Sequence, residues 1–291
     1  MAYTIGLDYG TNSARAVVVR LSDGAELATE IATYGHGEEG ILLDRRDPNV
    51  ARQHPADYLE AARRTIRTVV QRAAETGIKA EEVIALGVDT TGSTPLPITR
   101  DLTPLAMTDA FADNMTAMAW LWKDHSSTAE AEAITASART ERPRYLAKTG
   151  GVYSSEWFWA KIWRAFRDDP TVLEAADTWM EIADWIPAAL CGISDVSAVR
   201  RSVCAAGHKG MFHPSWGGYP DEEFLASLEP ALAAVRRSLP DEAWGVEHAV
   251  GTLDGEWAAS FGLVEGIPVA VGAFDAHLGA EIGRASCRER V

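Results

Sequence analysis

Cysteine is scarce in this sequence, because only 3 of the 291 residues are cysteine. Cys191, Cys204 and Cys287 stand at wide, irregular spacings, which excludes a dense disulfide framework and the paired spacing of a zinc site. We therefore expect free or buried thiols in a reducing environment. The N-terminus also lacks a basic segment ahead of an apolar run, and it meets a charge at Asp8, so a signal peptide is not expected.

Long apolar runs and an excess of positive charge are also missing. No segment approaches the roughly 20 apolar residues that a helix needs to cross a bilayer. The 27 basic residues are outnumbered by 42 acidic ones, so the net charge is −15. General binding to nucleic acid or to an anionic membrane surface is therefore not expected. What is present is a globular composition with 47% hydrophobic residues, and we expect a soluble cytoplasmic protein.

The end of the chain changes character abruptly. Three arginines fall within residues 283–291, GRASCRERV, directly after a stretch rich in glycine and alanine. This string resembles a translated sequencing adapter, and we interpret residues 281–291 as a non-native tail. A natural basic tail is the alternative. In the first interpretation Cys287 drops out of the cysteine count, and the natural protein continues further.

The first part of the chain predicts strands and one long helix. Segments rich in β-branched residues and separated by turn signals predict three strands. These strands are expected at residues 3–8, 14–20 and 26–34. A helix should run from Pro55 to Gly77, because apolar residues recur there at steps of three and four and a glycine is well placed to end it.

Two continuous apolar runs, residues 83–88 and 268–272, predict strands that are buried on both faces. Their order after an opening meander predicts an α/β fold with a mixed sheet flanked by helices. Residues 106–250 show mainly helical patterns and loops, which predicts a largely helical insertion. Six of the ten tryptophans lie between residues 120 and 180. Most of these should pack in a core, although an aromatic face also suits a sugar.

Three polar turns follow predicted strands, at residues 8–12 (DYGTN), 89–94 (DTTGST) and 274–277 (FDAH). In open α/β sheets, ligands bind beyond the carboxyl ends of the strands, so these turns are candidate binding segments. Taken alone, each of them is also compatible with an ordinary connection between elements.

The first turn has the residue types of a phosphate site. Gly10 would allow the backbone to approach closely, and Thr11 and Asn12 would supply donors. Asp8 could hold Mg²⁺ through water. The alternative is an ordinary hairpin turn.

Asp275 and Lys209 have two interpretations each. Asp275 should lie where a helix begins, so it is either an N-cap or a general base that takes a hydroxyl proton. Lys209 stands in the small-residue segment 206–212, AGHKGMF, which is either a surface loop or a ligand contact.

Taken together, these segments resemble the FGGY carbohydrate kinases, which share the actin-like, ribonuclease-H-like ATPase fold. The resemblance spans residues 3–280. The segment 5–15, IGLDYGTNSAR, is similar to the first phosphate motif of that family. The segments that resemble its ribulokinase branch in particular are 87–95 (GVDTTGSTP), 122–125 (WKDH), 206–209 (AGHK) and 272–277 (GAFDAH).

The resemblance implies a role for each matching residue. Asp275 would be the catalytic base and a sugar contact. The further sugar contacts would be Gly92, Ser93 and Lys209. The contacts to the ATP phosphates would be Asp8, Gly10, Thr11, Asn12 and Arg15. Asp8 would also be linked to Mg²⁺ through water.

The function implied by the resemblance is ATP-dependent phosphorylation of ribulose to ribulose 5-phosphate in arabinose catabolism. Residues 1–280 would then be the N-terminal sugar-binding domain, with its helical insertion at about 106–250. A C-terminal nucleotide-binding domain would be missing, so the chain would be inactive alone. The expected partners are the sugar and that second domain, and self-association is left open.

Three alternatives also stay open. A kinase for xylulose, glycerol or another polyol would use the same chemistry. An ATPase of the actin or chaperone type would need no base such as Asp275. A two-metal nuclease would use Asp8, Asp89 and Asp275 as ligands, although the acidic chain offers it no basic groove.

Overall fold

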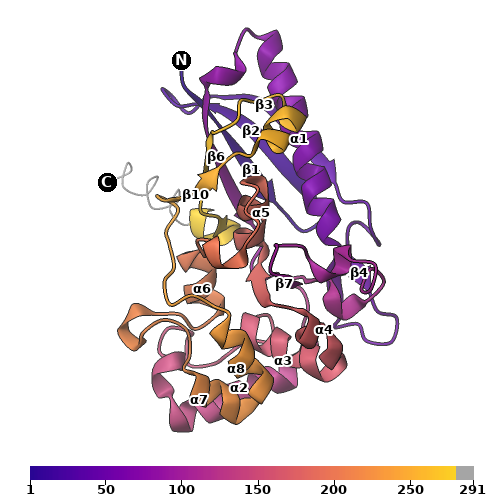
Figure 1. The fold of residues 1–291 in the computed structure, drawn as a ribbon, viewed down its shortest axis with the longest axis vertical. Helices are drawn as coiled ribbons and strands as arrows, with labels where there is room; N and C mark the ends of the chain where they lie inside the picture. Colours follow the sequence, from indigo (N-terminus) through magenta and orange to yellow (C-terminus); the bar gives the residue numbers. More distant parts are fainter. Residues whose placement is uncertain (280–291) are drawn as a thin grey trace.

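The computed structural model describes residues 1–279. Residues 280–291, and with them the expected non-native tail at 281–291, lie outside the described part. Among the described helices, none combines the length and the apolar character that crossing a membrane requires. The chain folds into two lobes, one built around a β-sheet and one built mainly from helices (Figure 1).

A mixed sheet forms the centre of the first lobe. Its strands are β1 (Tyr3–Tyr9), β2 (Ser13–Arg20), β3 (Glu26–Thr33), β6 (Val83–Thr90), β10 (Ala249–Thr252), β11 (Pro268–Ala270) and β12 (Ala273–Phe274). The strand order is β10–β11–β6–β1–β2–β3, and β12 pairs with β6. Because β1 is antiparallel to β2 and parallel to β6, the predicted meander and mixed sheet are confirmed.

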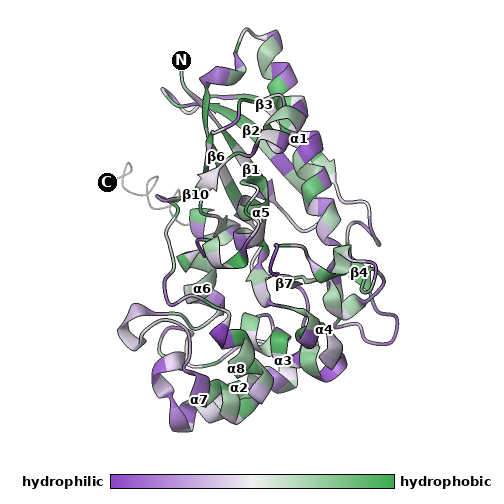
Figure 2. Cartoon of the chain, viewed as in Figure 1, coloured by the Kyte–Doolittle hydropathy of each residue, from purple (hydrophilic) through white to green (hydrophobic). Residues whose placement is uncertain are grey.

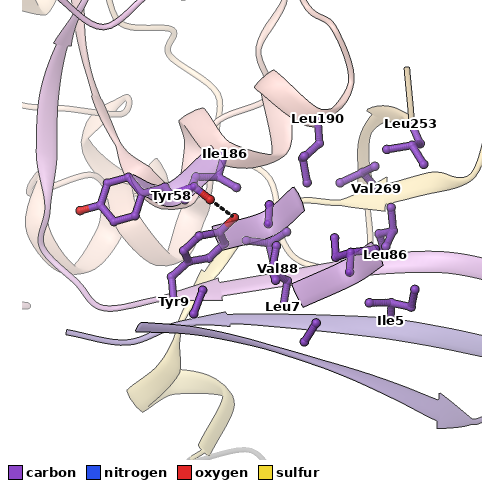
Figure 3. Packing of buried hydrophobic residues seen from close by; sticks show 14 of the residues in the cluster. Ile5, Leu7, Tyr9, Tyr58, Leu86, Val88, Ile186, Leu190, Leu253 and Val269 are labelled. Atoms are coloured by element: carbon purple, nitrogen blue, oxygen red, sulfur yellow. Dashed lines mark hydrogen bonds between the residues drawn. The ribbon is translucent and has the colours of Figure 1, made fainter. Parts of the chain in front are cut away.

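Alternation along β1 separates a core face of the sheet from an outer face. The odd-numbered residues of β1 are buried and the even-numbered ones are half-buried, as the period of two in a strand requires. Helices α1 (Pro55–Glu75) and α5 (Ile182–Leu190) pack on the core face. There the Tyr9 hydroxyl donates a hydrogen bond to the Tyr58 carbonyl at 3.1 Å, close to Leu7 (Figure 3).

Helix α1 has clear start and stop signals. Pro55 occupies its first turn, where a missing N–H leaves nothing unpaired, and the His54 ring accepts a hydrogen bond from the Ala56 N–H at 3.2 Å. The helix ends at Glu75, just before Gly77, whose φ of 90° favours glycine. Hydrophilic and hydrophobic residues are interspersed along α1 (Figure 2), as expected of a helix with one face on a sheet. The predicted helix is confirmed.

The second lobe is largely helical, as predicted. Its helices are α2 (Thr128–Glu141), α3 (Phe158–Asp168), α4 (Pro170–Ala175), α6 (Val203–Lys209), α7 (Glu222–Leu228) and α8 (Pro230–Arg237). The remaining helix, α9 (Gly255–Phe261), packs against α1 in the sheet lobe. Two small sheets contain β4 (Leu42–Leu43), β5 (Ala51–Gln53) and β8 (Ala119–Trp120) in one and β7 (Pro95–Ile98) and β9 (Thr178–Glu181) in the other. Trp120, Trp159 and Trp179 are fully buried in this lobe, and the half-buried Trp157 and Trp163 pack against the same cluster, which confirms the expected core packing of most of these tryptophans.

Candidate functional site

The ends of three strands meet at one edge of the main sheet. In the register of β1 with β6, Asp8 lies beside Asp89. In the register of β12 with β6, Phe274 lies beside Thr90. All three strands run in the same direction, so the polar turns that follow them leave the sheet together. The structure thus brings the three predicted turns side by side.

A pocket of ≈ 230 Å³ opens between these turns. Its lining residues are Thr11, Thr91, Gly92, Trp122 and Asp275. The indole Nε1 of Trp122 donates to Thr11 Oγ1 at 3.1 Å, which fixes the aromatic ring against the first turn. An aromatic ring with hydroxyl groups and a carboxylate suits a small polyhydroxylated ligand.

Gly92 lets the third turn approach the second. A Cβ atom at Gly92 would overlap the ring of Phe274, and Phe274 directly precedes Asp275. Because Gly92 has no side chain, Phe274 can pack against this turn. The Asp275 side chain therefore reaches the pocket.

Asp275 is the first residue of a helical segment that spans residues 275–279. It therefore lies one position inside the helix rather than at the N-cap that the alternative interpretation required. Its Oδ1 accepts a hydrogen bond from the Ala276 N–H at 2.5 Å. The residue is exposed and lines the pocket, so its carboxylate is accessible to a ligand.

Lys209 is the last residue of α6 and is only 6% exposed. The surface-loop interpretation of its segment is therefore wrong. Its Nζ lies 5.4 Å from the ring centre of Trp157 and 5.9 Å from that of Phe274, and no group within residues 1–279 accepts a hydrogen bond from it. Burial lowers the pKa of Lys209, while the charge of Glu181 opposes this shift. An ammonium on a largely buried side chain, with no acceptor among these residues, favours an oxygen-rich ligand nearby.

Ser93 does not line the pocket, although it was expected to contact the ligand. It is fully buried, and its hydroxyl donates to the carboxylate of Glu181. Its carbonyl accepts a hydrogen bond from Lys161 Nζ at 2.8 Å. The side chain is therefore engaged inside the protein, and Thr91 from the same turn faces the pocket instead.

Asp8 and Arg15 line a second hollow, of ≈ 260 Å³, on the outer face of the sheet. Asp89 lines it as well, beside Asp8 in the register of β1 and β6. Burial, followed by the negative charge of Asp8, raises the pKa of Asp89 to about 7. Among the described residues, Oδ1 of Asp89 is buried without a hydrogen-bond partner. Two adjacent carboxylates with an orphaned oxygen fit a hard cation such as Mg²⁺.

The other residues of the first turn maintain its shape. The Gly10 N–H donates to the Ser13 carbonyl at 2.9 Å. The side-chain amide of Asn12 donates to the Glu39 carbonyl at 2.7 Å, so that amide is already engaged. Of the expected phosphate contacts in this turn, Thr11 is the one that lines the pocket.

Three residues that line these two hollows have no expected contact to sugar or phosphate in the sequence analysis. Trp122 belongs to the tryptophans expected mainly in the core, yet it is only half-buried and lines the pocket, and the polar residues that follow it are the available signal. Thr91 stands in the second predicted turn, where the resemblance implies sugar contacts for the neighbouring Gly92 and Ser93. Asp89 ends a buried strand just as Asp8 does, and this parallel was the available signal.

A thiol and an imidazole lie beside the third turn. The Sγ of Cys204 lies 2.6 Å from His277 Nδ1. Burial raises the pKa of the Cys204 thiol to about 11, so a reactive thiolate is not favoured at neutral pH.

In the described part of the chain, no group of three or more His, Cys, Asp or Glu residues could hold a metal ion. The nuclease alternative, in which Asp8, Asp89 and Asp275 would bind metal together, gains no support from these residues.

Known proteins match this chain over almost its whole length. Residues 3–281 match the N-terminal domain of the FGGY family of carbohydrate kinases. A ribulokinase of Vibrio parahaemolyticus is 42% identical over 282 residues, which are 96% of this chain and 49% of that protein. A ribulokinase of Shouchella clausii is 40% identical over 284 residues, which cover 95% of this chain and 48% of that protein. The chain thus spans about half the length of the curated relatives it matches.

Solved structures agree with this match. A xylulose kinase from Rhodospirillum rubrum has a TM-score of 0.72 at 23% identity, over 94% of this chain and 49% of its own. At that identity the likeness shows the fold alone, and it confirms the predicted actin-like arrangement of a mixed sheet flanked by helices. The family match and the ribulokinase relatives cover the strands and turns that form both hollows. The chain therefore belongs to the FGGY family of carbohydrate kinases.

Proposed function

We propose that this chain is the sugar-binding half of an ATP-dependent kinase that converts ribulose to ribulose 5-phosphate. The observation that carries the proposal is the pocket in which Asp275 faces Gly92 and Trp122. Ribulokinases at 42% and 40% identity support ribulose as the sugar. The remaining half of such an enzyme would hold the adenosine of ATP, since these relatives are about twice as long.

Asp275 is the proposed catalytic base. The N–H groups at the start of a helix favour a negative charge, and the Ala276 N–H already donates to this carboxylate. An ionised carboxylate can accept the proton of a sugar hydroxyl while that oxygen attacks the γ-phosphate of ATP. Positioning and charge neutralisation supply most of the remaining catalysis, because phosphoryl transfer needs little covalent help from the protein.

Lys209 is the proposed charged contact to the sugar. An ammonium offers three donors and no acceptor, and that of Lys209 has no hydrogen-bond acceptor within residues 1–279. The ring of Phe274 lies near this ammonium and also packs over Gly92. Lys209 and the pocket residue Gly92 are therefore both neighbours of the Phe274 ring. Sugar hydroxyl groups would supply the missing acceptors.

The first turn and the outer hollow are the proposed phosphate side of the site. Thr11 would donate to a phosphate oxygen, and Arg15 would supply positive charge beside Asp8. Gly10 and Asn12 would hold the turn in shape rather than contribute side-chain donors. Mg²⁺, when bound near Asp8, would supply charge neutralisation of the phosphates. The orphaned oxygen of the neighbouring Asp89 supports this assignment.

We also propose that residues 1–280 form one domain, with residues 106–250 as its insertion and residues 281–291 as a non-native tail. The two lobes have separate apolar clusters, yet the insertion leaves and rejoins the sheet-containing lobe. The Lys161 hydrogen bond to Ser93 links the helical lobe to the second turn.

The proposed substrate can be tested with the full-length reading frame. The protein would be purified and assayed for ADP release with ATP and a panel of ribulose, xylulose and glycerol. We expect kcat/KM to be highest for ribulose. A higher value for xylulose or glycerol would reassign the substrate within the family, and ATP hydrolysis indifferent to every sugar would overturn the kinase proposal.

A further inference from the structure

Lys161 is a fully buried lysine whose ammonium is bound entirely by backbone. From α3, its Nζ donates to the carbonyls of Ser93 at 2.8 Å, Trp120 at 3.1 Å and Leu121 at 2.8 Å. Three acceptors match the three N–H donors of an ammonium, whereas a neutral amine has only two. The contacts therefore fit the charged form, even though burial lowers the pKa of Lys161.

Glu181 holds the same turn from the opposite side. It is the last residue of β9 and is buried. The Ser93 hydroxyl donates to its carboxylate, and the Thr94 N–H donates to its Oε2 at 2.6 Å. In the described part of the chain, no direct ion pair joins Lys161 to Glu181. The two charges meet through Ser93, whose carbonyl binds one and whose hydroxyl binds the other.

Two of the residues that Lys161 binds are direct sequence neighbours of residues that line the pocket. Ser93 directly follows Gly92, and Leu121 directly precedes Trp122. Both Gly92 and Trp122 line the pocket. Lys161 therefore ties together two backbone segments that are distant in sequence and that each present one wall to the ligand.

We propose that Lys161 and Glu181 are positioning residues that set the spacing between Gly92 and Trp122 and thereby determine affinity for the sugar. Neither side chain lines the pocket, so each acts through the backbone that it holds. The inference rests on the proposed sugar site and adds a buried support to it.

This role predicts a split between the two substrates. The hydrogen bonds of Lys161 and Glu181 go to the second turn and to the segment before Trp122, and none goes to the first turn, residues 8–12. Loosening them should therefore weaken sugar binding more than ATP binding. A merely structural role would lower the active fraction, which reduces kcat and leaves both KM values unchanged.

The test uses Lys161→Met and Glu181→Gln in the full-length enzyme, with KM for ribulose and for ATP, kcat and the melting temperature measured for each. Loss of hydrogen bonds to a charged group should raise KM for ribulose about tenfold in Lys161→Met and about threefold in Glu181→Gln. KM for ATP should stay within about twofold of wild type. Should Lys161→Met fail to fold, the milder Glu181→Gln decides.

Glu130→Gln is the matched control. Glu130 is also a buried carboxylate, and it accepts a hydrogen bond from Arg167 at 2.7 Å within the helical lobe. Its substitution should leave both KM values unchanged. An unchanged KM for ribulose in folded Glu181→Gln, or an equal rise in Glu130→Gln, would overturn the positioning role.

The wild-type enzyme separates this inference from the proposed function. If it phosphorylates another sugar of the panel but not ribulose, the substrate assignment fails and the same split is expected with that sugar. If it phosphorylates none, both the proposed function and the positioning role are overturned.

Discussion

Gly92 is a residue whose missing side chain shapes the pocket. An added Cβ would overlap the ring of Phe274, and overpacking of this kind costs about 1–3 kcal/mol. We expect Gly92→Ala to lower the free energy of unfolding of the 291-residue chain by about that amount, measured by urea denaturation. In the full-length enzyme it should also reduce kcat, because Phe274 carries Asp275 with it.

Gly87→Ala is the control for this substitution. Gly87 lies in β6, and a Cβ there would meet no atom within 4 Å. Its unfolding free energy should stay within about 0.5 kcal/mol of wild type. Equal losses in both variants would show that the cost at Gly92 is that of any added Cβ and not of the overlap with Phe274.

The Asp89 carboxyl should make the chain less stable as the pH rises. Its pKa is raised from 3.8 to about 7 by burial and by Asp8, so the folded chain disfavours the ionised form. The contribution of protonated Asp89 to the free energy of unfolding is therefore fully present below pH about 4, and it is lost as the pH rises towards 7. Asp89→Asn removes the charge, and we expect it to stabilise the chain at pH 8 by on the order of 1 kcal/mol after discounting for exposure.

Thermal denaturation at pH 4 and pH 8 checks this expectation. The gain in melting temperature for Asp89→Asn should be present at pH 8 and absent near pH 4. Asp23→Asn provides a control in which the change in melting temperature should have the opposite sign. A hydrogen bond from Arg20 lowers the pKa of Asp23, so removing this charge should lower the melting temperature at pH 8. If Asp89→Asn gave the same melting temperature as wild type at pH 8, the buried carboxyl would not be disfavoured in its ionised form.

Asp275→Asn separates proton acceptance from binding. The amide keeps the size and some hydrogen bonding of the carboxylate but cannot take a proton. In the full-length enzyme, kcat should fall on the order of 10²–10⁴-fold, and KM for ribulose should change much less. Steady-state kinetics measure both values, and a near-normal kcat would show that Asp275 is not the base.

At the scale of elements, α6 delivers Lys209 into the protein interior. Lys209→Met keeps the apolar stem among Trp157 and Phe274 but removes the ammonium. Hydrogen bonds to charged groups contribute about 1.5–3 kcal/mol, so KM for ribulose should rise at least about tenfold in the full-length enzyme. KM for ATP should change little. The exposed Lys148 supplies a control, since Lys148→Met should leave the KM for ribulose unchanged. If Lys209→Met also left the KM for ribulose at the wild-type value, the proposed sugar contact would be contradicted.

The elements with long periodic patterns could be predicted from the sequence. The strand at Tyr3–Tyr9 is predicted by β-branched residues before a turn signal. The helix at Pro55–Glu75 is predicted because apolar residues recur at steps of three and four over several turns. The strands β7 and β9 were not predicted, since four residues carry too little pattern and their pairing joins Ile98 to Thr178 across the chain.

The site was predictable only as far as its residues are local in sequence. Asp275 and Gly92 stand in turns that follow strong strand patterns, and the structure brings both to one pocket. The burial of Ser93 could not be predicted, because its partners Lys161 and Glu181 come from other elements. Such tertiary contacts leave no periodic signal in the sequence.

At the scale of the whole molecule, the chain has two apolar cores but only part of the proposed catalytic cleft. The sheet lobe and the helical lobe each bury their own cluster, so we expect the 291-residue chain to fold and to unfold cooperatively. Its relatives are about twice as long, so it should not phosphorylate ribulose by itself. Circular dichroism and an ADP-release assay check the two expectations, and measurable turnover by the chain alone would contradict the second.

The buried charges around Ser93 also bear on when the pocket becomes ordered. Lys161 and Glu181 hold this turn through contacts inside the protein, so the entropy of ordering it is lost during folding and not when the sugar arrives. Preorganisation of this kind favours affinity, because little further ordering accompanies binding. The Thr94 amide hydrogen, which is bonded to Glu181, should accordingly exchange slowly with solvent even in the sugar-free protein.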